Sequence, residues 1–332
     1  MSDTTLVTGG HGFAASWLAK ALLESGRRVR VLDLPEPRFT DIGTPRPSAL
    51  ELHGVSDEVE LVETDLRDAA GVSRAVAGTH TVFHLAAETI VGTAQASPRA
   101  TFEVNVLGTW NIMQACLECG VERVVVASSD KAYGASEGLP YREDFPLRAV
   151  NAYDASKAAA DILARSYWEG QGVPVAVTRF ANLYGGGDLN FSRLIPEAIS
   201  AAVDARRARI RSDGTPERDF LAVEDAVQAY LAIADSLEKD AARGEAFNAG
   251  GGEPYSVAEV LRLVGEVAGT EVDADFLDAA GGEIDRQYVD SGKLRELSGW
   301  QPRVGLREGL TRTIEWYREH PEARVPTQGA AG

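Results

Sequence analysis

The sequence predicts an α/β protein built on a doubly wound parallel sheet, with a smaller lobe formed by its C-terminal part. Two observations support this class. Short runs of β-branched residues alternate with stretches of helical periodicity through the first half of the chain. After Gly185 this alternation gives way to helices, short strands and loops. Because strands that alternate with helices pair in parallel, the first half is expected to form a sheet between two helical layers.

The individual elements follow from these patterns in chain order. Strands are predicted over residues 5–8, 29–32, 59–62, 81–85, 123–127 and 175–179. Helices are predicted over residues 13–23, 105–118 and 153–168, where apolar side chains recur on one face. The segment 34–58 carries four prolines among polar residues and is predicted to be a long surface connection.

The composition limits the classes of partner. The chain has 332 residues, of which 33 are basic and 50 acidic, for a formal net charge of −17. This balance disfavours a nucleic-acid binder, because binding of that kind needs a basic surface. No run approaches the ~18 apolar residues that cross a bilayer, and the first ten residues do not resemble a signal peptide. We therefore expect a cytoplasmic protein with neither nucleic-acid nor membrane partners.

The cysteines and histidines predict no metal site. Cys116 and Cys119 lie three residues apart, which could indicate a redox motif or half of a zinc site. A zinc site needs two further ligands, and no matching cysteine or histidine pair is present in the sequence. We interpret the pair as ordinary thiols on a helix.

A glycine-rich turn follows the first predicted strand. Residues 8–15, Thr-Gly-Gly-His-Gly-Phe-Ala-Ala, fit the pattern G-x-G-x-x-A. Glycine lets the backbone approach a pyrophosphate, and the small Ala15 lets the helix pack closely on the strand. The N–H groups at the start of that helix then face the phosphates. Taken alone, the motif is equally compatible with a plain tight turn.

The ends of the next strands favour a dinucleotide. Asp33 ends the second strand, where a carboxylate accepts hydrogen bonds from the adenosine ribose and repels a 2′-phosphate, so NAD is favoured over NADP. Asp65 and Leu66 follow the third strand and would flank the adenine, although Asp65 alone also suits a helix cap. Small residues after the fourth strand lie at the carboxyl edge of the sheet, where ligands bind in this architecture.

Two groups of residues suggest catalysis. Tyr153 and Lys157 are four residues apart and share a helix face, so the ammonium would favour the ionised phenol, which can then remove a hydroxyl proton. The same spacing is common in solvated helices, but there it does not follow a dinucleotide motif. Ser129, Asp130 and Lys131 follow the fifth strand at the same edge of the sheet. Their alternative interpretation is a surface ion pair at the start of a loop.

These residues resemble the extended short-chain dehydrogenase/reductase superfamily, the NAD-dependent epimerases and dehydratases of nucleotide sugars. The resemblance covers about residues 4–318 and includes the segments 105–109, 179–185, 213–220 and 299–302. It implies a Rossmann-type NAD-binding domain with the catalytic residues over 1–184, a mainly substrate-binding lobe over 185–320 and a flexible tail over 321–332. Ala15 and Ser129 depart from the usual Gly and Thr of the relatives.

Within the superfamily, the residues before Tyr133 distinguish the reactions. Sugar 4-epimerases that resemble this chain have small or hydroxyl residues where Asp130 and Lys131 stand, whereas 4,6-dehydratases have Asp followed by Glu or Lys. The chain is most similar to CDP-glucose 4,6-dehydratases. The resemblance therefore implies an NDP-hexose 4,6-dehydratase that gives a 4-keto-6-deoxy sugar and recycles bound NAD. A 4-epimerase is the alternative enzyme, and a non-catalytic NAD-binding regulator is the alternative from another class.

The resemblance also implies a role for each residue. Tyr153 would take the proton of the sugar 4-hydroxyl while Ser129 hydrogen-bonds the same oxygen, Lys131 or a group it orients would remove the C5 proton, and Asp130 would protonate the leaving C6 hydroxyl. The cofactor-binding set comprises Gly9, Gly12, Phe13, Ala14, Asp33, Asp65, Leu66, Leu85, Ala86, Ala87, Asn105, Tyr153 and Lys157. The substrate-binding set comprises Ser129, Asn182, Arg193, Arg218 and Arg286.

Two expectations remain for the surface. Plain surface charge is the alternative for the three arginines of the substrate-binding set and is weaker for Arg218 than for Arg193 and Arg286. Arg206, Arg207, Arg209 and Arg211 are predicted to form a solvated run. Relatives are usually dimers through a bundle that includes the helix of Tyr153, so a homodimer is expected.

Overall fold

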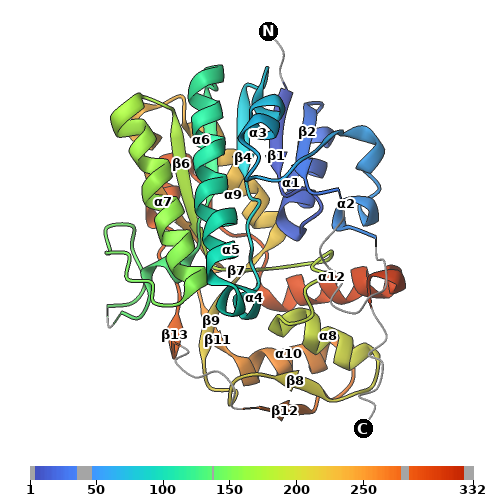
Figure 1. The fold of residues 1–332 in the computed structure, drawn as a ribbon. Helices are drawn as coiled ribbons and strands as arrows, with labels where there is room; N and C mark the ends of the chain where they lie inside the picture. The colour runs from blue at the N-terminus through green and yellow to red at the C-terminus, as the bar shows by residue number, and fades with distance from the viewer. Residues whose placement is uncertain (1–3, 36–46, 137, 278–283, 325–332) are drawn as a thin grey trace.

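The computed structural model describes residues 4–35, 47–136, 138–277 and 284–324, and its centre is a seven-stranded parallel sheet (Figure 1). The strand order is β10-β6-β5-β4-β1-β2-β3. The six predicted strands are confirmed, with small shifts at their ends. The strands are β1 (Thr4–Thr8), β2 (Arg28–Asp33), β3 (Glu60–Glu63), β4 (Thr81–His84), β5 (Arg123–Ala127), β6 (Val175–Phe180) and β10 (Ala246–Ala249).

Helices cover both faces of this sheet because its strands are apolar on both sides. Along β1, Val7 packs on one face with α1 and α9, and Leu6 packs on the other with α3, α6 and α7. The first layer comprises α1 (Phe13–Glu24), α2 (Ala49–Leu52), α9 (Val223–Ser236) and α11 (Gly292–Ser298). The second comprises α3 (Ala69–Val76), α6 (Gly108–Cys119) and α7 (Ala152–Gln171). The predicted doubly wound architecture is therefore confirmed.

A smaller lobe follows the sheet and has its own apolar core. In it, β9 pairs with β7, β11 and β13, and β8 pairs with β12. The strands are β7 (Asn182–Tyr184), β8 (Ala208–Ile210), β9 (Glu217–Ala222), β11 (Pro254–Ser256), β12 (Ala274–Phe276) and β13 (Arg286–Gln287). The helices are α8 (Leu194–Val203), α10 (Val257–Ala268) and α12 (Leu306–Glu319).

Short helical segments complete the described chain. A π-helical turn, η2 (Glu103–Leu107), precedes α6, so the predicted helix over residues 105–118 starts in a widened turn. The others are α4 (Val91–Ala96), α5 (Pro98–Phe102), η1 (Ser56–Glu58), η3 (Asp130–Tyr133), η4 (Asp240–Ala242) and η5 (Pro321–Ala323). None of the helices in the described ranges is long and apolar enough to cross a membrane.

Three boundaries differ from the sequence prediction. The chain returns to the large sheet after residue 184, because β10 pairs with β6, so residues 185–320 do not form one separate lobe. The predicted connection 34–58 contains α2, which begins with a capping box between Ser48 and Glu51, while residues 36–46 lie outside the described part. Of the predicted tail, η5 is packed with Ala323 fully buried, and residues 325–332 lie outside the described part.

Candidate active site

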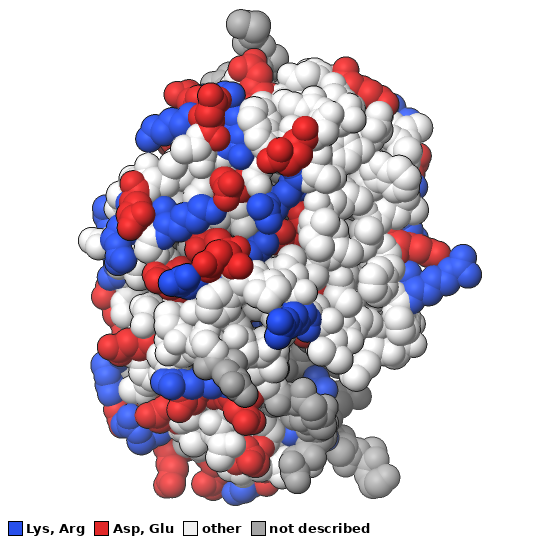
Figure 2. All heavy atoms as spheres, turned by 90° about the vertical axis from the view of Figure 1, so that its left-hand side faces the viewer, with Lys and Arg blue, Asp and Glu red and all other residues white. Residues whose placement is uncertain are grey.

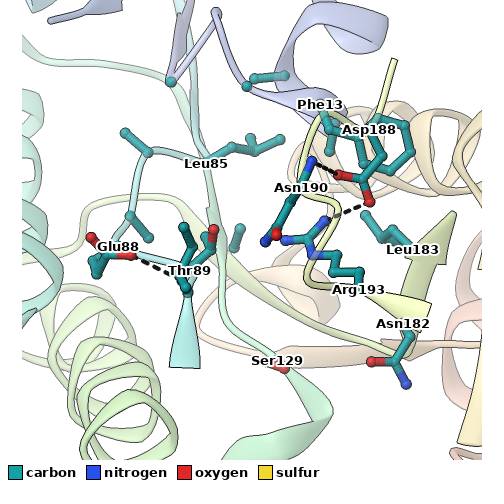
Figure 3. A pocket seen from close by; sticks show the side chains of 18 of the residues that line it. Phe13, Leu85, Glu88, Thr89, Ser129, Asn182, Leu183, Asp188, Asn190 and Arg193 are labelled. Atoms are coloured by element: carbon teal, nitrogen blue, oxygen red, sulfur yellow. Dashed lines mark hydrogen bonds and ion pairs between the residues drawn. The ribbon is translucent and has the colours of Figure 1, made fainter. Parts of the chain in front are cut away.

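A cavity of about 750 Å³ lies at the carboxyl edge of the sheet, with walls from both the sheet and the smaller lobe (Figure 3). Gly9 after β1, Leu85 after β4 and Ser129 after β5 line the sheet side. Asn182 and Arg193 line the lobe side. The strand order reverses between β1 and β4, and open α/β sheets bind their ligands at such a reversal.

The glycine-rich turn fits a dinucleotide. Gly9 has a φ of +78°, and a Cβ there would lie 2.8 Å from Cα of Ala86, so no larger residue fits against the loop after β4. Gly12 precedes α1 without a side-chain cap, which leaves the N–H groups of the first turn facing the cavity. Asp33 lines the cavity, and its two carboxylate oxygens accept from the N–H groups of His11 and Leu34 at 2.8 and 2.7 Å.

Most of the predicted cofactor-binding residues surround this part of the cavity. Asp65 lines it and is held by Arg67, whose Nε and Nη2 donate at 3.0 and 2.7 Å. The others that line it are Gly9, Gly12, Phe13, Ala14, Asp33, Leu66, Leu85, Ala86, Ala87, Tyr153 and Lys157. Asn105 does not. It is buried behind the wall, where its amide binds the backbone N–H and C=O of Glu88 and the hydroxyl of Ser156, so it acts on the site by fixing Glu88.

A buried histidine that the sequence analysis missed supports the same wall. His84 bonds Thr8 Oγ1 at 2.8 Å through Nδ1 and Thr109 Oγ1 at 3.0 Å through Nε2. Burial, with the nearby Lys157 ammonium, lowers the pKa of His84 to about 3, so the ring is neutral. Thr8 Oγ1 also accepts from the N–H groups of Leu85 and Ala86. This network fixes the loop that faces the glycine turn.

Tyr153 and Lys157 begin α7, whose N-cap Asn151 accepts from the N–H of Asp154. Burial raises the pKa of the Tyr153 phenol to about 12, while the nearby Arg193 guanidinium and the Ser129 side chain lower it. The Lys157 ammonium donates to the carbonyl of Ala127 at 2.5 Å, and burial lowers its pKa to about 8. Because desolvation of the phenolate outweighs the Arg193 charge in this structure, acidification of the phenol by Lys157 stays a prediction.

Asp130 and Lys131 come together on η3, the turn that follows β5. Asp130 is fully buried, and its Oδ1 accepts from Ser129 Oγ at 3.1 Å and from Lys131 Nζ at 3.4 Å. Its Oδ2 has no hydrogen-bond partner among the described residues. Lys131 Nζ also donates to Asn182 Oδ1 at 2.9 Å. Ser129 and Lys131 line the cavity and Asp130 lies directly behind them, so the pair is not a surface ion pair.

Of the three arginines in the predicted substrate-binding set, two line the cavity and one does not. Arg193 lines the cavity and pairs with Asp188 at 3.0 Å, as Figure 3 shows. Arg218 also lines it and donates to the carbonyl of Glu217 at 2.8 Å. Arg286 does not line it. Its guanidinium pairs with Glu217 at 2.6 Å and lies 5.0 Å from the centre of the Tyr288 ring, and its place in the set stays a prediction.

Arg211 lines the cavity but was not predicted to do so, because in the sequence it belongs to a cluster of four arginines. Arg207 pairs with Asp275 at an exposed site, as a solvated run would, but the side chains of Arg206 and its partner Glu197 are only 21% and 11% exposed, so the prediction is wrong for Arg206. Arg211, four residues after Arg207, lines the cavity instead. It has no recorded hydrogen bond or ion pair with any residue in the described ranges, in contrast to Arg193. The sequence contains no signal that separates these neighbours.

Further lining residues lacked any motif. Figure 3 shows Glu88 and Thr89 on the sheet side, opposite Asp188 and Asn190. Asp188 accepts from the N–H of Asn190 at 3.1 Å and so shapes the loop before α8. Across the described residues, no group of three or more His, Cys, Asp or Glu side chains is arranged to hold a metal ion.

Comparison with known proteins agrees with this geometry. The model of the "NAD dependent epimerase/dehydratase family" matches residues 5–250. A dTDP-glucose 4,6-dehydratase of Streptomyces griseus is 33% identical over 322 residues, covering 96% of this chain and 95% of that protein. A UDP-glucose 4-epimerase of Mycolicibacterium smegmatis is 31% identical, covering 95% and 98%. Among solved structures, a dTDP-glucose 4,6-dehydratase of Streptomyces venezuelae with NAD bound matches with a TM-score of 0.84 and 29% identity, covering 95% and 97%.

Proposed function

Because the chain belongs to the NAD-dependent epimerase/dehydratase family, we propose that it is a nucleotide-sugar 4,6-dehydratase. One observation carries the choice of reaction: Asp130 lies behind Ser129 and Lys131 at the carboxyl edge of the sheet, and its carboxylate contacts both of these cavity-lining side chains. Loss of water across C5 and C6 needs an acid and a base on one side of the sugar. An epimerase has no need of such a pair.

NAD is the cofactor of this family, and the cavity offers residues to hold it. The glycine turn and the start of α1 face the phosphates, while Asp33 suits the adenosine ribose. When bound, NAD would supply an acceptor for the hydride of the sugar C4 and a donor for its return to the substrate, with no net oxidation. The protein itself must move the protons.

Tyr153 removes the proton of the 4-hydroxyl. Tyr153 and Ser129 both line the cavity, and we assign both side chains to the same sugar oxygen. The pKa of about 12 set by burial leaves little phenolate at neutral pH, so a positive charge must gather at the phenol when the substrate is in place. Lys157, four residues on along the same helix face, supplies part of that charge.

Lys131 and Asp130 then expel water. In the 4-keto sugar the C5 proton is acidic, and the Lys131 amine removes it as the C6–O bond breaks. The departing hydroxyl takes a proton from the Asp130 carboxyl and leaves as water. Because Asp130 is buried, this proton reaches the cavity through Ser129 or Lys131, the two side chains that touch the carboxyl and line the cavity.

The lobe side of the cavity would hold the nucleotide diphosphate. Asn182, Arg193, Arg211 and Arg218 line it, and guanidinium groups suit phosphate oxygens. They supply local positive charge in a chain whose net charge is −17. We propose an NDP-hexose as the substrate, with CDP-glucose the first to test because the Asp-Lys pair resembles that of CDP-glucose dehydratases.

The test is product formation from CDP-, dTDP-, UDP- and GDP-glucose. A dehydratase yields a 4-keto-6-deoxy sugar, whose enone absorbs in strong base. Asp130→Asn and Lys131→Ala are each expected to lower its rate by about a hundredfold or more. Asp235→Asn and Lys239→Ala, at exposed positions, serve as matched controls. An undiminished rate in the Asp130 and Lys131 variants would refute the assignment.

Two other functions remain as outcomes of this test. A 4-epimerase is favoured by the similarity to the Mycolicibacterium enzyme, and it would give only isomeric sugars and tolerate Asp130→Asn. A non-catalytic regulator would bind NAD and turn over none of the sugars. The paired Tyr153 and Lys157 at the cavity argue against the regulator, because a sensor has no use for them.

We further propose that the enzyme is a homodimer through α6 and α7. Figure 2 shows a broad area with few charges on the side of the molecule where these helices lie. Trp110 on α6 is 54% exposed and Ile162 on α7 is 60% exposed, and the two helices pack against each other, so this side of the molecule presents large apolar side chains to solvent. A second copy of the same face would cover both. The cytoplasmic location expected from the composition stays a prediction.

A further inference from the structure

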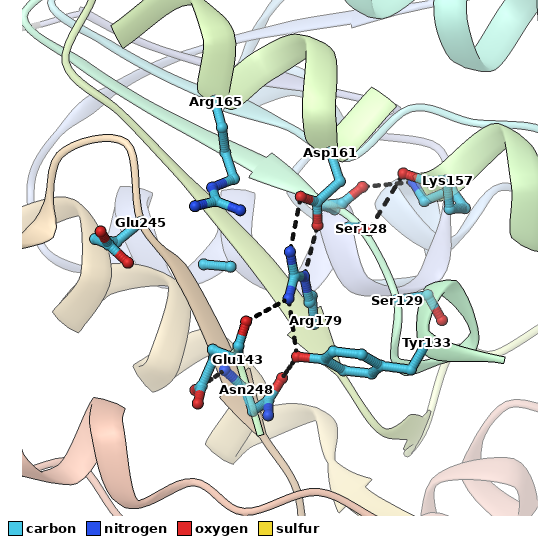
Figure 4. Close-up of polar contacts among 12 residues, drawn as sticks. Ser128, Ser129, Tyr133, Glu143, Lys157, Asp161, Arg165, Arg179, Glu245 and Asn248 are labelled. Carbon is cyan, nitrogen blue, oxygen red and sulfur yellow. Dashed lines mark hydrogen bonds and ion pairs between the residues drawn. The ribbon is translucent and has the colours of Figure 1, made fainter. Parts of the chain in front are cut away.

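A buried network of charges lies behind the catalytic residues (Figure 4). Arg179, at the end of β6, is 1% exposed, and Asp161 on α7 is fully buried. Nε and Nη2 of Arg179 donate to the two carboxylate oxygens of Asp161 at 2.7 and 3.0 Å. The free energy lost by desolvating two buried charges is close to the free energy gained from their attraction. Such a pair therefore adds little net stability, and we look for its role in the geometry of the site.

The third guanidinium nitrogen reaches the other side of the site. Nη1 of Arg179 donates to the Tyr133 hydroxyl at 3.1 Å and to the carbonyl of Glu143 at 3.2 Å. The Tyr133 hydroxyl in turn donates to Oδ1 of Asn248 on β10 at 2.8 Å. The guanidinium carbon also lies 5.0 Å from the centre of the Tyr133 ring. Tyr133 is thus held by its hydroxyl and by its ring.

The network joins the helix that carries the oxidising residue Tyr153 to the turn that carries the elimination pair, Asp130 and Lys131. Asp161 follows Lys157 by one helical turn and Tyr153 by two, so it lies on the same face of α7. Tyr133 ends η3, the turn that begins with Asp130 and Lys131. The guanidinium fork is planar and rigid, so it fixes the distance between the helix and the turn.

We propose that Arg179 and Tyr133 are positioning residues that set the elimination pair, Asp130 and Lys131, against the oxidising residue Tyr153. Neither lines the cavity, so neither touches the substrate. The inference rests on the proposed dehydratase function. We assign the Tyr133 hydroxyl to the elimination step alone, because this hydroxyl holds η3. The helix α7 is held separately, by the ion pair between Asp161 and Arg179.

Tyr133→Phe tests this assignment with the smallest change. It removes one hydroxyl and its two hydrogen bonds but keeps the ring, which stacks on Tyr141 at 4.9 Å between centres. We expect KM for the NDP-hexose to change by less than about twofold and kcat to fall by at least about tenfold, because a small misplacement of reacting groups is costly. Reduced cofactor should accumulate in the steady state, seen as nicotinamide absorbance, because oxidation continues while elimination lags.

The controls separate positioning from stability. Tyr167→Phe removes the hydroxyl of another tyrosine on α7, one that bonds Gln114 at an exposed site, and should leave all three readouts unchanged. Arg179→Lys keeps the charge but loses the fork that holds both η3 and α7, so it should slow oxidation as well as elimination and accumulate less reduced cofactor than Tyr133→Phe. If Tyr133→Phe lowers kcat without accumulation, raises KM, or changes nothing while the wild type dehydrates normally, the positioning role is wrong. If the wild type forms no 4-keto-6-deoxy sugar, the proposed function fails and this inference fails with it.

Discussion

Replacing Lys157 with methionine should remove activity and yet stabilise the fold. Lys157 is only 6% exposed, and burial lowers the pKa of its ammonium from 10.5 to about 8. At ~1.4 kcal/mol per pH unit, holding the charged form in this site costs the native state about 3 kcal/mol near pH 7. Methionine has a similar length and carries no charge, so this cost disappears.

One loss opposes the gain. Lys157 donates to the carbonyl of Ala127, and the variant leaves that acceptor without this hydrogen bond, at a cost of about 1 kcal/mol. The free energy of unfolding of Lys157→Met should therefore exceed that of the wild type by about 2 kcal/mol at pH 7. The oxidation of the sugar should fall by at least about a hundredfold, because the phenol then loses its neighbouring cation.

The difference in unfolding free energy between Lys157→Met and the wild type should decrease as the pH rises. Between pH 8 and 10.5 the native wild type binds fewer protons at this lysine than the unfolded chain does, so its stability rises with pH in that window. The advantage of Lys157→Met is therefore full below about pH 8 and shrinks toward pH 10.5.

Urea unfolding followed by circular dichroism at pH 7 and pH 10 measures both quantities. Lys239→Met, the same chemical change at an exposed lysine, is the matched control and should shift the unfolding free energy by less than about 0.5 kcal/mol. A Lys157→Met protein that is less stable than the wild type at pH 7, or whose advantage does not shrink at pH 10, would refute the reasoning.

Three further predictions concern the cofactor, the nucleotide and the assembly. Gly9→Ala should weaken NAD binding by at least about tenfold in calorimetry, because the added Cβ would meet Ala86. Gly26 has a similar positive φ but open space around it, so the control Gly26→Ala should lower only the stability, by ~1 kcal/mol. Equal NAD affinities of the two variants would contradict this prediction. Arg211→Ala should raise KM for the NDP-sugar by about tenfold and leave NAD affinity unchanged. The control Arg209→Ala should leave the steady-state kinetics unchanged. A larger rise of KM in Arg209→Ala than in Arg211→Ala would show that Arg211 does not belong to the site. Trp110→Glu should convert the proposed dimer to a monomer in light scattering, and a dimeric mass for this variant would place the interface elsewhere.

The sequence predicted the parts of the site that depend on local structure. The glycine turn, the ends of β4 and β5 and the Tyr153–Lys157 spacing are each contained in a short segment, so the sheet edge could be assembled by topology alone. The arginines could not be sorted in this way. Arg286 is occupied by Glu217, which is distant in the chain, whereas Arg211 has no such neighbour among the described residues and faces the cavity.

Burial was the second property that the sequence did not reveal. The pKa of Tyr153 rises because the folded chain removes water from the phenol, and no motif encodes the amount of water removed. Asp130 was expected in the cavity with Lys131, but its side chain packs one layer deeper. Whether a carboxylate lies in the wall or behind it depends on the loop conformation around it, here set by the Ser129 cap of η3.

The return of the chain to complete the large sheet also limits how this protein can be divided. Strand β10 covers residues 177–180 of β6 through a parallel ladder, and Lys293 fastens it there by donating to the carbonyl of Ala246. A fragment that stopped at residue 184 would keep the glycine turn and the catalytic side chains but expose that ladder of backbone groups. Unpaired apolar strands of this kind recruit other chains, so such a fragment would aggregate instead of acting as a separate NAD-binding module.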